Sequence, residues 1–441
     1  MSRINEIMKI AQPIRDNYFA RSPPWSKGGR FRVGTYLPNL DRARLVFSVR
    51  DMEPLEQWYV LSGYVRFHQW LGFQPYRLAS GRVSPFAVLT LAQFLGVLVN
   101  LALIIYRRRC ILYHCEAIGM VVDFIKLLTI GLSILVMYVE LFRTSDNICG
   151  CWRLLYKAHQ TLQRYGMVDH RRLTRVMRLY WWFVLGSLLY FVVNESYLYL
   201  CAEQMQTKRF YVYFFALQYI LNIKLQQIIY PAILLDTYLR MTRAALEHHV
   251  GLLQCSERLG SMRYMEFLAG KLNALKALYS DLFQASVALN EAYGRTYLII
   301  YCKNYIHILS NSYWVVFWLL NNQRHHAARI ISRLICRIIL LGATFYINSC
   351  AMKSAQNLRH RLHTMDLGIQ IKCQALFTRI ESFLQQTQFE SIQLTAGDFF
   401  DLNFSPILTI IFSVGAYISI FIQQAINQID ELKCNDYEKQ C

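Results

Sequence analysis

The sequence is poor in charged residues, and poorest in acidic ones. Only 17% of its 441 residues are charged, with 28 Asp and Glu against 47 Lys and Arg, whereas 55% are hydrophobic. Soluble domains carry about 25% charged residues. The apolar residues occur in blocks of roughly 20, the length that crosses a hydrocarbon core of about 30 Å. The composition therefore argues against a soluble protein and predicts an all-α, polytopic membrane protein.

The motifs of enzymes and metal proteins are missing as well. The 12 cysteines form no CxxC pair. The CxC of Cys149 and Cys151 has too few further ligands nearby for zinc, so reduced thiols are favoured. There is no HExxH, P-loop or nucleophile elbow, and the histidine pairs at 248–249 and 325–326 do not resemble metal sites. We expect no catalytic residue, no metal, no cofactor and no enzymatic activity.

The N-terminus and the net charge narrow the class further. The first 20 residues are polar and contain no apolar core, so no cleavable signal peptide is predicted and the first apolar helix would direct membrane insertion. A net charge of +19 would suggest nucleic acid in a soluble protein. Here the basic residues lie between the apolar blocks, and no nucleic-acid-binding module is recognisable. We expect a lipid bilayer, and not nucleic acid, as the partner.

Seven apolar segments are long enough to cross a bilayer. We place them at about 84–106, 118–140, 179–202, 210–236, 292–320, 333–352 and 398–424. An earlier aromatic stretch, 55–78, is interrupted by Arg66, His68 and Arg77, and is expected to form an interfacial or partly inserted helix.

The basic residues predict the orientation of these seven spans. Of the Lys and Arg residues, 32 precede the first span or lie in the second, fourth and sixth loops. Only 9 lie in the other loops and the tail, and 6 lie within spans. Because basic residues are retained in the cytoplasm, we expect a cytoplasmic N-terminus and an extracellular C-terminus. The Arg107–Arg109 run is an exception. This topology is opposite to that of a G-protein-coupled receptor, and no internal repeat supports a secondary transporter.

The predicted organisation follows from these boundaries. It comprises a cytoplasmic N-terminal region with the interfacial helix (1–83), transmembrane helices one to four (84–236), cytoplasmic anchor helices (237–291), transmembrane helices five and six (292–352), a further cytoplasmic anchor helix (353–397), the last transmembrane helix (398–424) and an extracellular tail (425–441). The anchor segments carry leucines at helical spacing, including Leu272, Leu275 and Leu362, and such a stripe needs a partner. Packing within the loop domain and contact between subunits are both open.

The last span has the most distinctive sequence. Asp398 and Asp401 are expected near its start, on one face of the helix. Pro406 and Gly415 would loosen it into two parts. Four residues follow one side at intervals of three and four: Tyr417, Ile420, Gln423 and Gln424. An amide on an apolar helix needs water or a polar partner, so both a pore lining and an interhelical hydrogen bond are open. Phe412 is expected to face other helices.

Polar and aromatic residues also gather in the halves of the spans expected to be extracellular. Small-molecule pockets combine aromatic walls with a few polar groups. The candidate pocket residues are Asn194, Tyr197, Gln218, Tyr219, Asn311, Trp314 and Trp318, although helix packing also accounts for any single aromatic among them. In the second span, Asp123 and Lys126 are spaced to pair, an arrangement that often joins helices within a membrane.

Three motifs and the predicted topology together resemble the insect gustatory receptors. Tyr417 is followed six positions later by Gln423, as in their C-terminal signature, and the segment 395–400 (Thr-Ala-Gly-Asp-Phe-Phe) matches as well. The stretch 70–75 (Trp-Leu-Gly-Phe-Gln-Pro) is similar to their Leu-Gly-Leu-x-Pro element. Ala416 and Gln424 depart from the usual Thr and Phe. These differences affect packing around the last helix.

The resemblance implies a ligand-gated, non-selective cation channel in the plasma membrane of a sensory neuron. It would be a homotetramer, or a heterotetramer with other gustatory receptors, in which four copies of the last helix line the pore. Ile420 would then lie at a hydrophobic constriction, with Gln423 one turn beyond it. A small-molecule tastant would bind within each subunit. Ile418 follows Tyr417 where sugar-sensing relatives carry an acidic residue, which favours a bitter or other non-sugar ligand. The alternatives are a G-protein-coupled-type chemoreceptor and a secondary transporter.

Overall fold

The protein is helical throughout the part of the chain that its computed structural model describes. The described residues are 55, 58–78, 84–107, 117–200, 205–256, 262–369 and 374–440, and all belong to one compact unit, Val49–Cys441. The helices are α3 (Tyr59–Trp70), α4 (Ala87–Tyr106), α6 (Ala117–Arg143), α7 (Ser145–Arg164), α8 (His170–Leu200), α9 (Met205–Ser256), α10 (Met262–Leu320), α11 (Arg324–Ile369), α12 (Gln374–Phe389) and α13 (Ser405–Gln440). An isolated antiparallel bridge joins Thr395 and Asp401 in the segment before α13.

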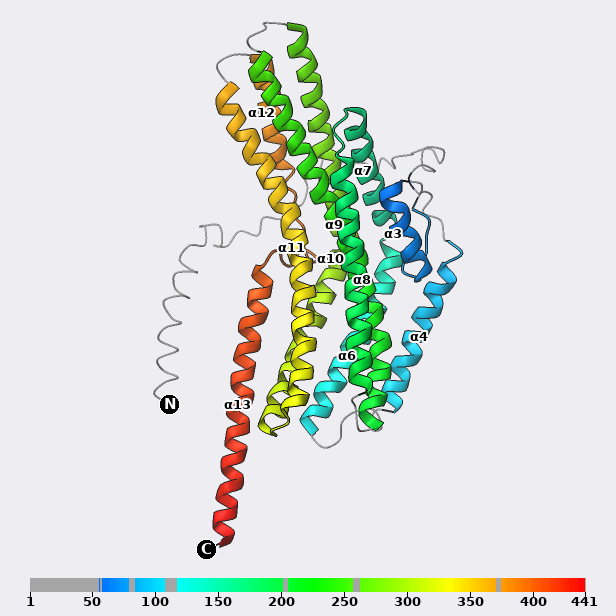
Figure 1. Cartoon of the computed structure of the whole chain (residues 1–441), viewed down its shortest axis with the longest axis vertical. Coiled ribbons are helices and arrows are strands. Elements are labelled where there is room, and N and C mark those ends of the chain that lie inside the picture. The colour runs from blue at the N-terminus through cyan, green and yellow to red at the C-terminus, as the bar shows by residue number, and fades with distance from the viewer. Residues whose placement is uncertain are drawn as a thin grey trace. The chain divides into compact units, whose positions relative to one another are not determined.

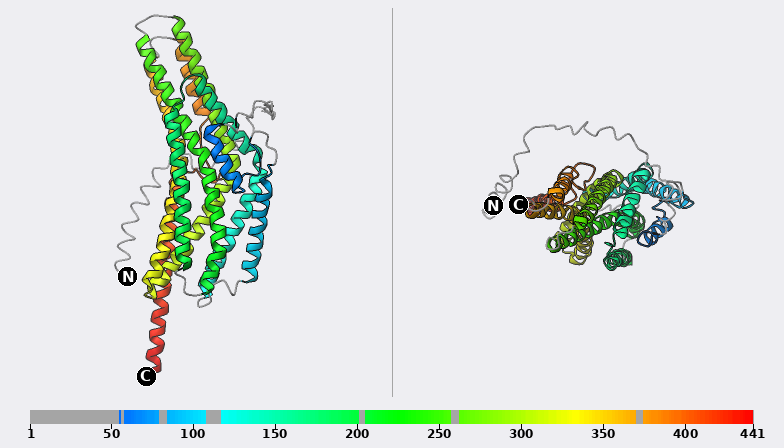
Figure 2. Two further views of the ribbon diagram at one scale, coloured as in Figure 1. Left: turned by 45° about the vertical axis from the view of Figure 1, so that its right-hand side comes forward. Right: turned by 90° about the horizontal axis from the view of Figure 1, so that it is seen from above.

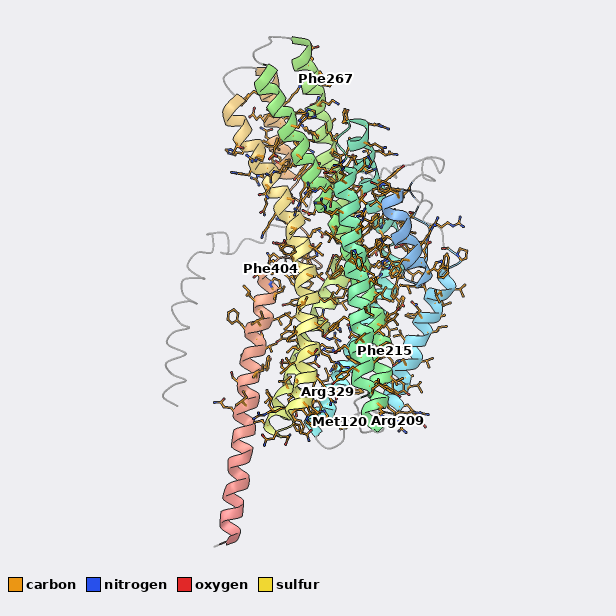
Figure 3. All side chains as sticks on the ribbon, viewed as in Figure 1. Met120, Arg209, Phe215, Phe267, Arg329 and Phe404 are labelled. Carbon is orange, nitrogen blue, oxygen red and sulfur yellow. The ribbon has the colours of Figure 1, made fainter. Side chains whose placement is uncertain are left out.

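The long helices run side by side, with a bundle at one end and a smaller helical cluster at the other (Figures 1 and 2). The bundle contains α4, α6, α8 and α13, with the adjoining parts of α9, α10 and α11. We call the opposite cluster the anchor region: α7, α12, the described residues of 237–291, and residues 353–369. In Figure 3, Phe267 marks its far end, whereas Met120, Arg209 and Arg329 mark the opposite end of the bundle.

Each of the seven predicted spans overlaps a helix, and the seventh begins seven residues before its helix. Within the described residues, four segments have both the length and the apolarity to cross a membrane: Ala87–Tyr106, Gly119–Arg143, His170–Tyr197 and Arg324–Thr364. In α9 and α10 the expected spans contain buried polar residues such as Lys224 and Lys303. The apolar part of α13, Ser405–Ile420, is shorter. The prediction of an all-α protein with apolar helices is confirmed, and the number of crossings stays a prediction.

The anchor leucines pack inside a single chain. Leu272, Leu275 and Leu362 are all buried without any second subunit. Much of the cover for α10 comes from α7, a helix that the sequence analysis did not anticipate, and α12 contacts both α10 and α11. These three side chains are therefore covered by their own chain, and contact between subunits through the anchor helices stays a prediction.

The start of the last helix also differs from the expectation. Asp398 has a φ of 62° and follows Gly397 with a φ of 58°, so both adopt the left-handed conformation that a helix cannot contain. The helix begins at Ser405, seven residues later, and Asp398 and Asp401 do not share a helical face. The expected break is also wrong, because α13 is continuous through Gly415. Pro406 lies in the first turn, where a missing N–H costs nothing.

The stretch 55–78 contains the helix expected there. One face of α3 is buried, with Val60, Leu61 and Tyr64 almost fully covered. The Tyr64 hydroxyl donates to the Gln227 carbonyl at 2.9 Å, and the Tyr230 hydroxyl donates to the Val60 carbonyl. These bonds fix α3 against α9, so this helix is part of the packed structure.

Candidate ligand pocket and pore helix

Charged and polar side chains occupy the interior of the bundle, in the half where α8 and α10 end at Leu200 and Leu320. We call this set the polar interior: Asp123, Lys126, Glu195, Gln218, Lys303, Asn304, His307, Asn311 and Arg333, all buried. Intramembrane ionisable residues are costly and mark functional sites by default. The polar interior is therefore the first place in the bundle to look for a functional site.

The first part of the polar interior joins α6 to α10. Asp123 and Lys126, which are spaced to pair with each other in the sequence, both contact α10. The indole N–H of Trp314 donates to Asp123 Oδ1 at 3.0 Å, and Lys126 Nζ donates to Asn311 Oδ1 at 2.9 Å. The Asn311 amide also lies 2.9 Å from His307 Nδ1. The two charges of α6 therefore fix the position of α10.

The second part joins α8, α9, α10 and α11. Lys303 Nζ donates to Gln218 Oε1 at 3.2 Å and to Asn304 Oδ1 at 3.3 Å. The Glu195 carboxylate pairs with the Arg333 guanidinium, and these side chains are only 4% and 6% exposed. A pair buried this deeply must be hydrogen-bonded to offset its desolvation. It locks α8 to α11.

A cavity of about 440 Å³ opens between α8 and α11 beside this ion pair. Its walls are mainly apolar, and its polar lining includes Asn194, Glu195, Asn222, Arg333 and Arg337. The full lining is Trp182, Phe183, Gly186, Ser187, Tyr190, Phe191, Asn194, Glu195, Asn222, Arg333, Ile335, Cys336, Arg337, Ile339 and Leu340. Ligand pockets are typically about 300–1,000 Å³ and apolar with a few polar groups, so this cavity is the candidate ligand site.

A much smaller cavity, about 20 Å³, continues towards α10. It is lined by Gln218 and Lys303 among others, and it shares Asn222, Arg337 and Leu340 with the larger cavity. Its volume is enough for about one water molecule. The two cavities together connect the space between α8 and α11 with the polar interior.

The predicted pocket residues are distributed over three environments. Asn194 lines the larger cavity and Gln218 the smaller one. Asn311 and Trp314 belong to the contacts between α6 and α10, and Trp318 stacks on Trp314 with ring centroids 6.0 Å apart. Tyr219 stacks with Phe215 on α9, and Tyr197 is 54% exposed; neither lines either of the two cavities described above.

Three basic residues of the cavities were not anticipated. Lys303 lies in the expected fifth span, and Arg333 and Arg337 lie one turn apart near the start of the sixth. The sequence did carry a signal for them, because a charge within an apolar span is by itself a reason to expect a site. The sequence could not show that α8, α9 and α11 line the larger cavity, or that α9, α10 and α11 line the smaller one.

The segment before α13, residues 393–397, contacts α10 through hydrogen bonds and close backbone packing. Asn290 donates from Nδ2 to the Gln393 carbonyl at 2.7 Å and accepts from the Thr395 N–H at 3.1 Å. A Cβ at Gly294 would lie 3.0 Å from the backbone nitrogen of Gly397. The two backbones approach closely because neither position carries a side chain.

A second contact lies at the first turn of α13. The Tyr301 hydroxyl donates to the Pro406 carbonyl at 3.2 Å, and the Tyr301 ring lies 4.7 Å from that of Phe400. Figure 3 labels Phe404 at this end of α13. Tyr301 lies between Ile300 and Lys303, which both line the smaller cavity. One turn of α10 thus contacts both the cavity and the start of α13.

The predicted pore residues lie on a helix that its own chain leaves largely uncovered. Ile410 and Val414 are buried, and α13 packs against α10. Tyr417 and Ile420 are 42% and 47% exposed, and Gln423 is exposed too. Gln424 lies on the same helix, and its side chain is outside the described residues. Phe412 is 75% exposed, so other helices of its own chain do not cover it, and its contact with other helices stays a prediction.

The cysteines and histidines of the described residues form no group that could hold a metal ion. Cys149 and Cys151 are free and buried in α7. Burial raises the pKa of the Cys151 thiol to about 12, so this residue stays protonated and unreactive at physiological pH.

The comparisons with known proteins agree with a receptor of this architecture. Two solved structures have a similar fold: an insect olfactory receptor, OR5 from Machilis hrabei, in complex with eugenol and alone. Their TM-scores are 0.58 and 0.54 at 12% and 10% identity, and each match covers 85% of this chain and 99% of the other. This chain thus shares the fold of that olfactory receptor.

The sequence comparison gives the family. A model of the family described as 7tm Chemosensory receptor matches residues 61–428, and the chain therefore belongs to that family. Gustatory receptor 23a of Drosophila melanogaster is 30% identical over 166 residues, which span 35% of this chain and 41% of that relative's length. The predicted relationship to insect gustatory receptors is confirmed.

Proposed function

We propose that the protein is a taste receptor that acts as a ligand-gated, non-selective cation channel. The cavity between α8 and α11 takes a small-molecule tastant of the non-sugar type. Four subunits, alike or mixed with other gustatory receptors, surround a pore lined by α13. The N-terminus is cytoplasmic and the C-terminus extracellular, in the plasma membrane of a sensory neuron. Membership of the chemosensory receptor family and the fold support this proposal.

The observation that carries it is the position of α10 between the cavity and α13. Ile300 and Lys303 line the smaller cavity, while Tyr301 holds the Pro406 carbonyl at 3.2 Å. A ligand in the larger cavity would displace α11 relative to α10, since Arg337 and Leu340 line both cavities. Because interfaces of packed helices switch between discrete arrangements, a shift of α10 would move the first turn of α13.

The proposed gate is a ring of apolar side chains. An apolar constriction closes a channel by dewetting, without any charged plug. Ile420 provides such a side chain, and Gln423 follows at nearly one turn with a polar group that can contact water. The exposure of both in the single chain is compatible with a central position among four copies.

Current recording from a heterologous cell tests the proposal. Ile420→Ala removes apolar lining and should raise the ligand-independent current. Gln423→Lys places a positive charge in a low-dielectric path and should suppress cation flux. The matched control is Ile418→Ala, the same change two positions away, where the side chain is partly buried against its own chain. If Ile420→Ala and Ile418→Ala behave alike and Gln423→Lys conducts normally, α13 does not line the pore.

A further inference from the structure

The charges around the cavity do not balance. Within the described residues, four cationic groups lie close together: Lys126, Lys303, Arg333 and Arg337. Three of them surround one ring, with Lys126 Nζ 5.2 Å, Arg333 Cζ 5.5 Å and Arg337 Cζ 6.0 Å from the centroid of Phe214. The neighbouring carboxylates are Asp123 and Glu195, which accept from Trp314 and Arg333. The region therefore has a net positive charge.

Arg337 is the cation best placed to bind a ligand. It lines both cavities. Among the described residues it makes no hydrogen bond or ion pair; its recorded contact is the Phe214 ring. The guanidinium presents five N–H donors in a fork that matches a carboxylate. The neighbouring Glu195 carboxylate is already bonded to Arg333, so it serves two guanidinium groups. A cation within an apolar bundle is costly, and an anion at this point would offset that cost.

The other walls of the cavity are suited to an apolar chain. Trp182, Phe183, Ile335 and Ile339 line it, and Trp182, Ile335 and Ile339 are exposed on the outside of the bundle. Burial of the methylene groups of such a chain against these walls would stabilise the complex. Apolar walls on one side and a guanidinium on the other define an amphiphilic site.

We propose that this cavity binds an amphiphilic anion, a small organic acid whose carboxylate pairs with Arg337 and whose hydrocarbon chain lies against Trp182 and Ile339. The inference rests on the proposed function, because it names the class of tastant. The same chemistry is present in two sources, a free organic acid and an anionic membrane lipid, and the free acid is the ligand proposed here.

Three probes of one chain length test the need for charge: octanoate, octanol and octanamide. Binding is measured by the thermal stabilisation of the purified full-length receptor in nanodiscs of neutral lipid. Octanoate should bind about tenfold or more tightly than the two neutral probes, since hydrogen bonds to charged groups are the strong ones. Equal stabilisation by octanoate and octanol would overturn the proposal without any variant.

Two variants test the role of Arg337. Arg337→Gln should remove the preference for octanoate over octanol, and Arg337→Lys, which keeps the charge, should retain much of it. The matched control is Arg329→Gln on the same helix, since Arg329 lines neither cavity and its replacement should leave the preference unchanged. A preference that survives in Arg337→Gln would contradict the assignment.

The remaining measurements separate the lipid source and the proposed function. Nanodiscs that contain phosphatidylglycerol test for a lipid occupant. If these nanodiscs stabilise the wild type but not Arg337→Gln, and octanoate does not stabilise the wild type in neutral lipid, the occupant is an anionic lipid and the acid proposal is wrong. Current recording from the same receptors provides the other distinction. If Ile420→Ala conducts while octanoate does not bind, the acid proposal fails and the channel stands. If octanoate binds while neither the wild type nor Ile420→Ala conducts, the channel assignment fails and the acid site stands.

Discussion

The two ends of α10 are built on opposite principles. Between residues 272 and 289 its buried side chains are mainly leucines, and polar residues such as Asn273 and Gln284 are exposed. Between residues 303 and 312 its buried side chains include Lys303, Asn304, His307 and Asn311. Neighbouring bundle helices expose apolar side chains there, including Leu185 and Leu189 of α8.

This reversal matches a change of solvent along one helix. In water, burial of apolar surface is the dominant stabilising term. Between apolar lipid tails there is little hydrophobic driving force, and helices are joined by packing and polar contacts. The anchor region is therefore organised like a soluble helical domain. The bundle instead uses its polar interior to fix the helices around the cavity.

The largest expected effect comes from the anchor region. Leu275→Asn buries an amide where a leucine packed, which removes apolar contact and leaves polar atoms without partners. Large-to-small core substitutions alone cost about 2–5 kcal/mol, and unpaired polar groups add to this. We expect a marked loss of folded receptor, measured by size-exclusion chromatography of the detergent-solubilised protein after heating.

The matched control introduces the same amide two residues away. Ala277 is exposed, so Ala277→Asn should lower the melting temperature only slightly. If both substitutions destabilise the protein equally, the anchor region does not depend on its apolar interior and the contrast with the bundle is wrong.

The sequence predicted the helices better than their partners. Apolar periodicity placed every expected span so that it overlaps a helix, because a single helix is largely determined by local pattern. It missed α7, whose buried residues include Cys149, Cys151 and Trp152, since the segment was assigned to a loop. It also could not show that Leu272 and Leu362 pack within one chain, because a stripe of leucines does not identify what covers it.

The site was predicted in part, for a similar reason. Asn194 and Gln218 line the cavities, and their role in ligand binding stays a prediction; Arg337 was not among the predicted residues. Composition indicates that a charge within a span is unusual, but only the crossing of α8, α9, α10 and α11 shows which charges meet. Acidic residues favour the first turn of a helix, so the sequence predicts a helix start at Asp398, where the structure has a turn. The positive φ of both residues could not be inferred from that preference.

A second prediction concerns the boundary between the two regions. Gly294→Ala adds a Cβ that would lie 3.0 Å from the Gly397 nitrogen, a backbone atom. Overpacking costs about 1–3 kcal/mol, which exceeds the roughly 1 kcal/mol that Ala gains over Gly in a helix. We expect a displaced segment before α13 and a weaker ligand-evoked current, with surface expression largely retained.

The control for this variant lies on the same helix. A Cβ at Gly270 would meet nothing within 4 Å, so Gly270→Ala should preserve the current and slightly stabilise the receptor. A normal ligand-evoked current in Gly294→Ala would show that the contact with Gly397 does not couple the two regions.

The smallest effect concerns a buried histidine of the anchor region. His159 of α7 is buried, with its Nδ1 3.4 Å from the Tyr238 hydroxyl. Burial, with a smaller contribution from His170, lowers the pKa of His159 from 6.5 to about 4. Because the folded state favours the neutral ring, its contribution to stability is complete above about pH 6.5 and declines as the pH falls towards 4.

Thermal unfolding of the detergent-solubilised receptor between about pH 7.5 and pH 5 should show this decline, and His159→Gln should make it shallower. The slope should not vanish, since burial also lowers the pKa of His68, to about 3. The matched control, His360→Gln, replaces an exposed histidine of α11 and should retain the wild-type slope. An unchanged slope in His159→Gln would mean that this ring is accessible to protons in the folded state, and that the anchor region is less dry than its leucines indicate.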